Sequence, residues 1–313
     1  MTQTSVNALL SAQHPLDPVD VRGWVRTRRD AKAFSFHEIN DGSCLKNIQV
    51  IADEHLENFD AIKSFPPDPL LLSPAPCAPP LEKNRHGKFM RRKSTFSRQR
   101  RRLSAAEKRH TDEFLRTISH LRPRTNKYGA AFRIRSRLSF AVHQFFQERG
   151  FFYIHTPILT GSDCEGAGEL FQVTSLTLDD LPKKDGKVDY TADFFGKPAN
   201  LTVSGQLEAE AAALALGNVY TFGPTFRAEN SNTRRHAAEF WMVEPEMAFC
   251  DLRQDMAVAE AFVKFLVDCA LNSCAEDLHL FAKFVDKRLM ADLETILSKP
   301  FVRLPYAEAV AIL

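Results

Sequence analysis

Apolar and polar residues alternate along residues 20–53, the pattern of strands whose side chains point to opposite faces of a sheet. Turn signals at Arg29–Asp30 and at Asp41–Gly42 interrupt the alternation. The stretch is also rich in β-branched and aromatic residues, which favour strands. The sequence therefore predicts a meander of about three strands near the start of the chain.

The alternation stops where prolines become dense. Seven of the nineteen residues 64–82 are proline, and such a density removes the backbone donors that a sheet needs. Residues 83–102 follow with ten Lys or Arg and no acidic residue. We expect no strand or amphipathic helix in residues 63–107, and we interpret them as an aberrant or disordered segment. A genuine insertion and a stretch read out of frame both fit this composition.

From about residue 108 ordinary patterning returns. Residues 130–148 place apolar side chains at helical spacing before Gly150, which predicts a long helix that ends there. Further helices are predicted at residues 207–216 and 252–272, and a short one is predicted before Pro123. Predicted strands lie at residues 151–160, 170–173, 200–204, 218–227 and 238–249. Because few β-α-β alternations occur, we expect an α+β protein with a mainly antiparallel sheet flanked by helices.

The distribution of charge and the spacing of the cysteines limit the classes of protein to which the chain can belong. The net charge is +2, and removing the ten cations of residues 83–102 leaves 2 − 10 = −8 for the remainder. That basic run is either a nucleic-acid contact or a solvated tail. The six cysteines are scattered without zinc spacing, so reduced thiols are expected and no metal site. No apolar run of about 18 residues and no signal-like start occur, so we expect a cytoplasmic protein without a membrane span.

The most informative stretch for chemistry is residues 223–249, where a strand ends in Phe226-Arg227, a polar loop follows, and a second strand opens at Glu239-Phe240. A guanidinium at such a strand end can bind a phosphate through two parallel hydrogen bonds. From the residues alone, a hairpin with surface ion pairs is the alternative. The words FRAEN and TRRHAAEF in this stretch resemble motif 2 of the class II aminoacyl-tRNA synthetases, closest to the asparaginyl and aspartyl branch.

The resemblance implies ATP and Mg²⁺ as cofactors and assigns a nucleotide site. Arg227 is implied as the catalytic residue, which stabilises charge as the amino-acid carboxylate attacks the α-phosphate. Glu229 is implied to hold the adenine amino group or the adjoining backbone, and Arg235 and His236 to meet the β- and γ-phosphates. Phe240 is implied to stack on adenine, and a core position is its alternative.

The same resemblance implies an amino-acid pocket made by Glu165, Ser204, Gln206 and Glu244. Aspartyl relatives carry a lysine where this chain has Ala209, and an Asp where it has Glu244. A carboxylate without that lysine would accept from a carboxamide and repel aspartate, so the pocket is expected to select asparagine. Backbone capping is the alternative role for Glu165 and Gln206.

Two further segments carry the resemblance. The stretch FFYIHTPILT, after the long helix, is similar to motif 1, and its Pro157 is implied to lie at a homodimer interface. Residues 1–62 resemble part of the OB-fold anticodon-binding domain of the same branch. There Phe36 matches a base-stacking position, and arginines stand nearby for phosphates; for Phe34 a barrel-core position is the alternative. The implied phosphate contacts are Arg26, Arg28 and Arg29.

Together these features predict three segments: a partial OB-fold at 1–62, the aberrant stretch at 63–107, and a class II catalytic domain at 108–313. All thirteen glycines lie at or before Gly223, so motif 3 and the acidic Mg²⁺ ligands near it are expected to be missing. The expected function is ligation of L-asparagine to tRNA(Asn). A nondiscriminating aspartyl-tRNA synthetase and an inactive RNA-binding remnant stay open as alternatives, and an asparagine synthetase is disfavoured by the OB-like start.

Overall fold

The computed structural model describes residues 4–14, 19–64, 89–91, 110–164, 166, 169–231, 233 and 236–313. Backbone contacts divide the chain into two compact units. The first comprises Met1–Arg135 and Cys274–Ala291, and the second comprises Ser136–Ser273 and Asp292–Leu313. The boundaries of these two units differ from those of the three functional segments expected from the sequence, and the three segments stay a prediction.

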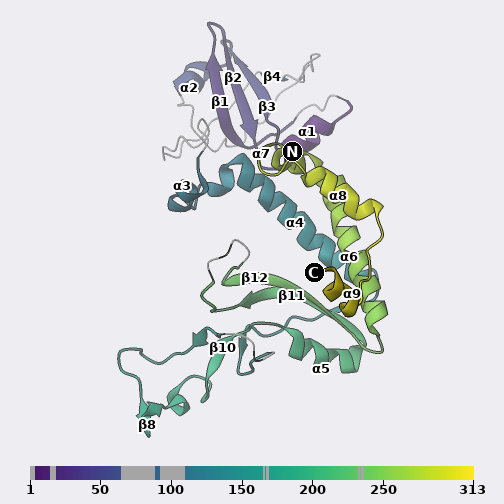
Figure 1. The fold of residues 1–313 in the computed structure, drawn as a ribbon. Coiled ribbons are helices and arrows are strands. Elements are labelled where there is room, and N and C mark those ends of the chain that lie inside the picture. Colours follow the sequence, from purple (N-terminus) through teal and green to yellow (C-terminus); the bar gives the residue numbers. More distant parts are fainter. Residues whose placement is uncertain are drawn as a thin grey trace. The chain divides into compact units, whose positions relative to one another are not determined.

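The first unit contains the predicted meander. Strands β1 (Trp24–Asp30), β2 (Phe34–Asn40) and β3 (Ile48–Asp53) pair antiparallel in that order, so the prediction of about three strands is confirmed (Figure 1). The expected turn at Gly42 is confirmed by its φ of 84°, a conformation that glycine adopts without strain. β1 continues through Asp30, so the first turn lies later than the sequence indicated.

A fourth strand corrects one expectation. β4 (Phe89–Arg91) pairs parallel with β3, although no strand was expected between residues 63 and 107. Its three residues are too few to show the alternation from which strands are predicted. Residues 65–88 and 92–107, on which the rest of that interpretation falls, lie outside the described residues.

Two small clusters form the core beneath this sheet. Helix α1 (Val6–Ser11) starts at Ser5, whose hydroxyl caps it by accepting from the Ala8 amide, and buries Val6 and Leu9 against Val25, Ile39 and Ile48. Helix α2 (Phe59–Ser64) buries Phe59 and Ile62 with residues of and after β3. The alternating apolar positions of the strands thus find their partners in short flanking helices.

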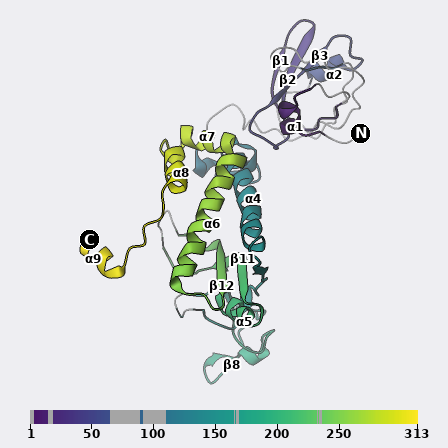
Figure 2. The same cartoon turned by 90° about the vertical axis from the view of Figure 1, so that its right-hand side faces the viewer.

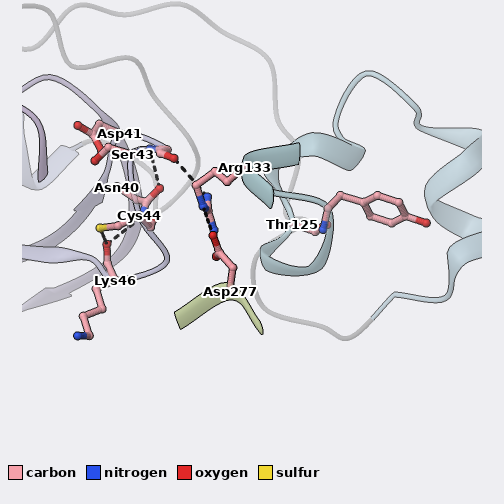
Figure 3. A network of polar contacts seen from close by, with 10 residues as sticks. Asn40, Asp41, Ser43, Cys44, Lys46, Thr125, Arg133 and Asp277 are labelled. Carbon is pink, nitrogen blue, oxygen red and sulfur yellow. Dashed lines mark hydrogen bonds and ion pairs between the residues drawn. The ribbon is translucent and has the colours of Figure 1, made fainter. Parts of the chain in front are cut away.

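Polar contacts join the β2–β3 loop to helices of the same unit. After α3 (Asp112–Thr117) and a 3₁₀ turn (Arg122–Arg124), α4 (Asn126–Gln147) carries Arg133. Figure 3 shows Arg133 reaching both this loop and Asp277 of α7 (Ala275–Phe284). Its Nε and Nη2 donate to Asp277 at 2.9 and 2.6 Å, and its Nη1 donates to the Gly42 carbonyl at 3.2 Å.

The second unit is built on a long hairpin. Strands β11 (Asn218–Phe226) and β12 (Glu239–Met247) pair antiparallel, and β5 (Phe152–Tyr153) pairs parallel with β11. Side chains of α4 and α6 (Leu252–Ser273) pack on one face of the hairpin, and both helices lie beside it (Figures 1 and 2). The packed rings include Phe145, Phe146 and Tyr220, all fully buried. The predicted helices over these segments are confirmed, and Gly150, with φ 79°, follows α4 as expected.

A smaller sheet and one helix complete the surroundings of the hairpin. β6 (Leu159–Thr160), β10 (Ala199–Leu201) and β7 (Gln172–Val173) pair antiparallel around β10. The single strand expected at 151–160 is instead the two short strands β5 and β6, with Pro157 between them, where no backbone donor is available. Helix α5 (Gln206–Leu216) confirms the prediction at 207–216.

Further elements carry weak sequence signals. The hairpin β8 (Lys183–Lys184) and β9 (Lys187–Val188) follows β7, and a 3₁₀ turn (Tyr190–Ala192) follows the hairpin. Helices α8 (Leu289–Ser298) and α9 (Tyr306–Ile312) stand near the end of the chain. Among the described helices, none combines the length and the apolar character needed to cross a bilayer.

Candidate functional site

Alternation along the β11–β12 hairpin separates a polar face from the core face. The register pairs Thr221 with Glu244 and Thr225 with Phe240. Cross-strand partners share a face, and every second residue returns to it, so these four side chains lie on one side. The other side carries Tyr220 and the rings beneath the helices. The polar face is therefore the one that α4 and α6 do not cover.

Arg227 follows β11 on this polar face. Its amide donates to the Ala238 carbonyl at 3.0 Å, which continues the ladder one residue beyond the strand. The guanidinium carbon lies 5.6 Å from the centre of the Phe240 ring. Its Nε is buried and has no hydrogen-bond partner among the described residues. Because a buried donor without an acceptor is costly, this geometry suits a residue that meets an anionic ligand.

Glu244 is the centre of a hydrogen-bond network on the same face. Its Oε1 accepts from the Ser204 hydroxyl. Its Oε2 accepts from the Thr221 hydroxyl at 2.8 Å and from the Gly205 amide at 3.2 Å. Ser204 Oγ in turn accepts from the Gln206 amide at 3.0 Å. Three predicted pocket residues, Ser204, Gln206 and Glu244, are thus brought together by contacts between the start of α5 and the hairpin.

Close approach at this corner depends on Gly205. A Cβ atom there would lie 2.6 Å from Thr156 Oγ1 and 3.3 Å from Thr221 Cγ2, so a side chain would collide with Thr156 and crowd the hairpin. Gln206 also donates from Nε2 to Glu210 at 2.9 Å. Ala209 is fully buried against Ala213 and Val219, so position 209 lies in the core beneath α5.

The described acidic residues of this region do not gather into a cluster of metal ligands. Burial and the neighbouring carboxylates of Glu210, Glu244 and Asp255 raise the pKa of Glu246, which lies on the same face of β12. Within the described part of the chain, no group of three His, Cys, Asp or Glu side chains is arranged to hold a metal ion. The described residues therefore form no protein-only site for the Mg²⁺ implied by the sequence.

The remaining predicted nucleotide residues are spread over the loop between β11 and β12. Glu229 and His236 are exposed, and His236 Nδ1 contacts the Thr233 hydroxyl. Arg235, like Glu165 of the predicted pocket, lies outside the described residues. Pro157, the predicted interface residue, is exposed between β5 and β6. None of these contacts tests the predicted roles, which stay predictions.

In the first unit, the predicted RNA-binding residues lie on two faces of one sheet. Arg29 pairs with Phe36 across β1 and β2, and its guanidinium carbon lies 5.2 Å from the ring centre. Phe34 lies on that same, half-exposed face, and Ser35, His37 and Ile39 occupy the buried positions of β2. The barrel-core alternative for Phe34 is therefore not favoured by its burial.

The other two predicted arginines have protein partners. Arg28 pairs with His37 in the register and forms an ion pair with Asp30 at 3.0 Å, with 15% of its side chain exposed. Arg26 Nη1 donates to the Arg124 carbonyl at 2.7 Å, and burial, reinforced by Arg124 and Arg133, lowers the pKa of Arg26. Phe36 and Arg29 are thus the predicted pair that the structure leaves open to a ligand.

Comparison with known proteins fits this geometry. The sequence profile of the family described as tRNA synthetases class II (D, K and N) matches residues 111–313. The chain belongs to this class II synthetase family. It is 56% identical over 325 residues to the asparagine–tRNA ligase of Oleidesulfovibrio alaskensis and 53% identical over 321 residues to that of Nitratidesulfovibrio vulgaris strain DP4. In both comparisons the whole chain is covered, together with 68% of the relative.

A solved structure of a relative has a similar fold. The crystal structure of asparaginyl-tRNA synthetase from Pyrococcus horikoshii complexed with asparaginyl-adenylate matches with a TM-score of 0.78 at 26% identity. All of this chain and 67% of that one are covered. The α+β class II fold expected from the sequence, with a partial OB-fold in front, is confirmed.

One buried residue of the site was missed from the sequence. Thr221 is 2% exposed and donates to Glu244, but nothing in the sequence of residues 218–227 indicates that it belongs to the site. The signal that could have found it is the hairpin register, since Thr221 stands opposite Glu244. Register across a long loop is not readable from one strand's pattern.

Proposed function

We propose that this protein ligates L-asparagine to tRNA(Asn) through an asparaginyl adenylate, with ATP as the energy source. The observation that carries the proposal is the single polar face of the hairpin with Arg227, Phe240 and Glu244, to which Ser204 is hydrogen-bonded. The Arg227 Nε there is buried and has no partner among the described residues. The family membership and the names of the relatives support the same reaction.

In the first step, a carboxylate oxygen of asparagine attacks the α-phosphorus of ATP. A new oxygen–phosphorus bond forms as the bond to the bridging oxygen breaks, and pyrophosphate leaves. Arg227 holds the carboxylate and the α-phosphate together and offsets the charge that builds between them. Phe240, half-buried beside this guanidinium, stacks on the adenine. No step is assigned to Mg²⁺, since the described residues hold no cluster of three His, Cys, Asp or Glu side chains for it.

In the second step, a hydroxyl of the terminal adenosine of the tRNA attacks the acyl carbon of the adenylate. The ester bond forms, AMP leaves, and the hydroxyl proton passes to solvent or to the AMP phosphate. Phe36 and Arg29 of the first unit bind the anticodon loop by stacking and by phosphate contact. A homodimer with Pro157 at its interface and a cytoplasmic location stay predictions.

Binding of stable adenylate analogues tests the proposal on the chain itself. Calorimetry with sulfamoyl analogues of asparaginyl- and aspartyl-adenylate should show a preference of about tenfold or more for the asparagine analogue. Arg227→Lys should weaken its binding about thirtyfold, because an ammonium cannot form the paired hydrogen bonds of a guanidinium. Arg253→Lys, at an exposed position on α6, is the matched control and should bind as the wild type does.

Two results would replace the proposal with one of its alternatives. Equal binding of both analogues would identify a nondiscriminating aspartyl-tRNA synthetase. Binding of tRNA without binding of either analogue would identify an RNA-binding remnant.

A further inference from the structure

Donors of the protein itself occupy most of the acceptor positions of the Glu244 carboxylate. An ionised carboxylate offers about four acceptor positions, two on each oxygen. The Thr221 hydroxyl and the Gly205 amide take Oε2 at 2.8 and 3.2 Å, and the Ser204 hydroxyl takes one position of Oε1. About one position, on Oε1, is left for a further donor.

We propose that Thr221 is a specificity-determining positioning residue, an inference that rests on the proposed function. Thr221 holds the Glu244 carboxylate so that the one open acceptor position of Glu244 receives an N–H of the asparagine carboxamide. Aspartate has only acceptors at the same place, so a fixed Glu244 oxygen repels it. Thr221 itself touches no substrate. It acts by fixing which oxygen of Glu244 faces the ligand.

Burial and packing explain why Thr221 can fix this orientation. Its side chain is 2% exposed, on β11, directly opposite Glu244 in the hairpin register. Its methyl group lies beside Gly205, 3.3 Å from where a Cβ of that residue would stand. Because the hydroxyl is buried, turning it away from Oε2 would cost its hydrogen bond, so it stays aimed at Oε2.

A second set of contacts fixes Oε1 from the start of α5. Thr202 Oγ1 donates to the Ser204 carbonyl at 2.6 Å, and Ser204 Oγ accepts from the Gln206 amide at 3.0 Å. Ser204 therefore has its amide, carbonyl and hydroxyl all engaged, and it cannot follow Glu244 if the carboxylate turns. With Thr221 removed, Oε2 keeps only the Gly205 amide, and rotation of the carboxylate moves the open position out of the pocket.

The experiment measures affinity for the two adenylate analogues by calorimetry on the full chain. Thr221→Val keeps the shape of the side chain and removes the donor, and it should lower the preference for the asparagine analogue about tenfold, mostly by weakening that analogue. Thr221→Ser keeps the hydroxyl and should hold the preference within about twofold of the wild type.

Thr225→Val is the matched control. Thr225 is also 2% exposed, lies on the same face of the same strand, and donates to the Phe240 carbonyl at 3.3 Å rather than to Glu244. Its loss should cost stability as Thr221→Val does, without changing the ratio of the two affinities. Amide hydrogen exchange, which needs no ligand, should quicken at Gly205 in Thr221→Val and stay unchanged in Thr225→Val.

The outcomes separate the two proposals. If the wild type prefers asparagine and Thr221→Val keeps that preference, the role of Thr221 is wrong and the proposed function stands. If Thr221→Ser loses the preference as fully as Thr221→Val, packing of the methyl group rather than the hydrogen bond is responsible, and the inference also fails. If the wild type binds neither analogue, the proposed function fails and the inference fails with it.

Discussion

At the scale of single residues, the two neighbouring arginines Arg28 and Arg29 have opposite surroundings because a strand turns successive side chains to opposite faces. Arg28 faces inward to Asp30 and His37, and Arg29 faces outward to Phe36. The resemblance to the OB-fold domain implied phosphate contacts for both arginines. Only 15% of the Arg28 side chain is exposed and it is paired with Asp30, whereas Arg29 is exposed, so Arg29 is the better candidate for RNA.

Binding of an anticodon stem-loop tests this distinction. Phe36→Ala should weaken binding about tenfold, because a base loses its stacking partner. Arg29→Ala should weaken it while lowering the slope of log affinity against log salt by about 1, since one phosphate contact is lost. Phe114→Ala, which removes a ring that is 46% exposed on α3, is the control and should leave affinity unchanged. Equal losses for Phe114→Ala and Phe36→Ala would contradict the assignment.

At the scale of elements, α7 shows how the surroundings of an ion pair decide its contribution. Glu276 and Asp277 are adjacent, and each is paired with a cation. Asp277 forms an ion pair with Arg133, and 11% of the Asp277 side chain and 23% of the Arg133 side chain are exposed. Glu276 forms an ion pair with Lys46, and there the exposed fractions are 48% and 67%. Arg133 also donates to the Gly42 carbonyl, so the pair of Arg133 and Asp277 connects the β2–β3 loop with α4 and α7 (Figure 3).

Thermal and denaturant unfolding should separate these two pairs. Asp277→Asn should lower the free energy of unfolding by roughly 2 kcal/mol, because the half-buried guanidinium loses its charged partner. Glu276→Gln, one residue away on the same helix, should change it by less than about 0.5 kcal/mol, since exposed pairs are solvated and screened. Similar losses for both variants would mean that burial does not set the contribution of these pairs.

Elements were predictable where their pattern was long. The alternation of β1 to β3 and the helical spacing of α4 and α6 came directly from the residues, since six to twenty-two residues of pattern leave few alternatives. β5 and β6 are two residues each, and β4 is three, so pairing with distant strands rather than local pattern creates them. Propensity carries no information on such pairing.

At the scale of the whole molecule, the candidate site joins segments far apart in the sequence. The start of α5 meets Glu244 some forty residues later, and Thr221 lies between them. The resemblance to a family named Arg227, Ser204 and Glu244, but only the register of the hairpin shows that Thr221 stands among them. Residue types indicate the chemistry of a site, and the supporting contacts require the fold.

The buried histidine of the first unit gives the molecule a defined response to acid. His37 is 2% exposed, and burial, with Arg28 adding to it and Asp30 opposing it, lowers its pKa from 6.5 to about 4. The Ser35 hydroxyl lies 2.9 Å from its Nε2 and donates to Asp30 at 2.6 Å, so the ring belongs to a buried polar network. Because the folded state resists protonation, the unfolded chain takes up the proton first as the pH falls.

The contribution of His37 is therefore complete above pH 6.5, declines between pH 6.5 and pH 4, and is lost below that range. The size of the loss is about 3 kcal/mol, from the separation of the two pKa values. His37→Gln removes the titration, so the wild type should lose stability relative to this variant by that amount between pH 7 and pH 4. Urea unfolding followed by the fluorescence of Trp24 and Trp241 measures this loss. His14→Gln, at an exposed position, should keep the wild-type slope. Parallel pH curves for the wild type and His37→Gln would show that the imidazole does not sense pH within the fold.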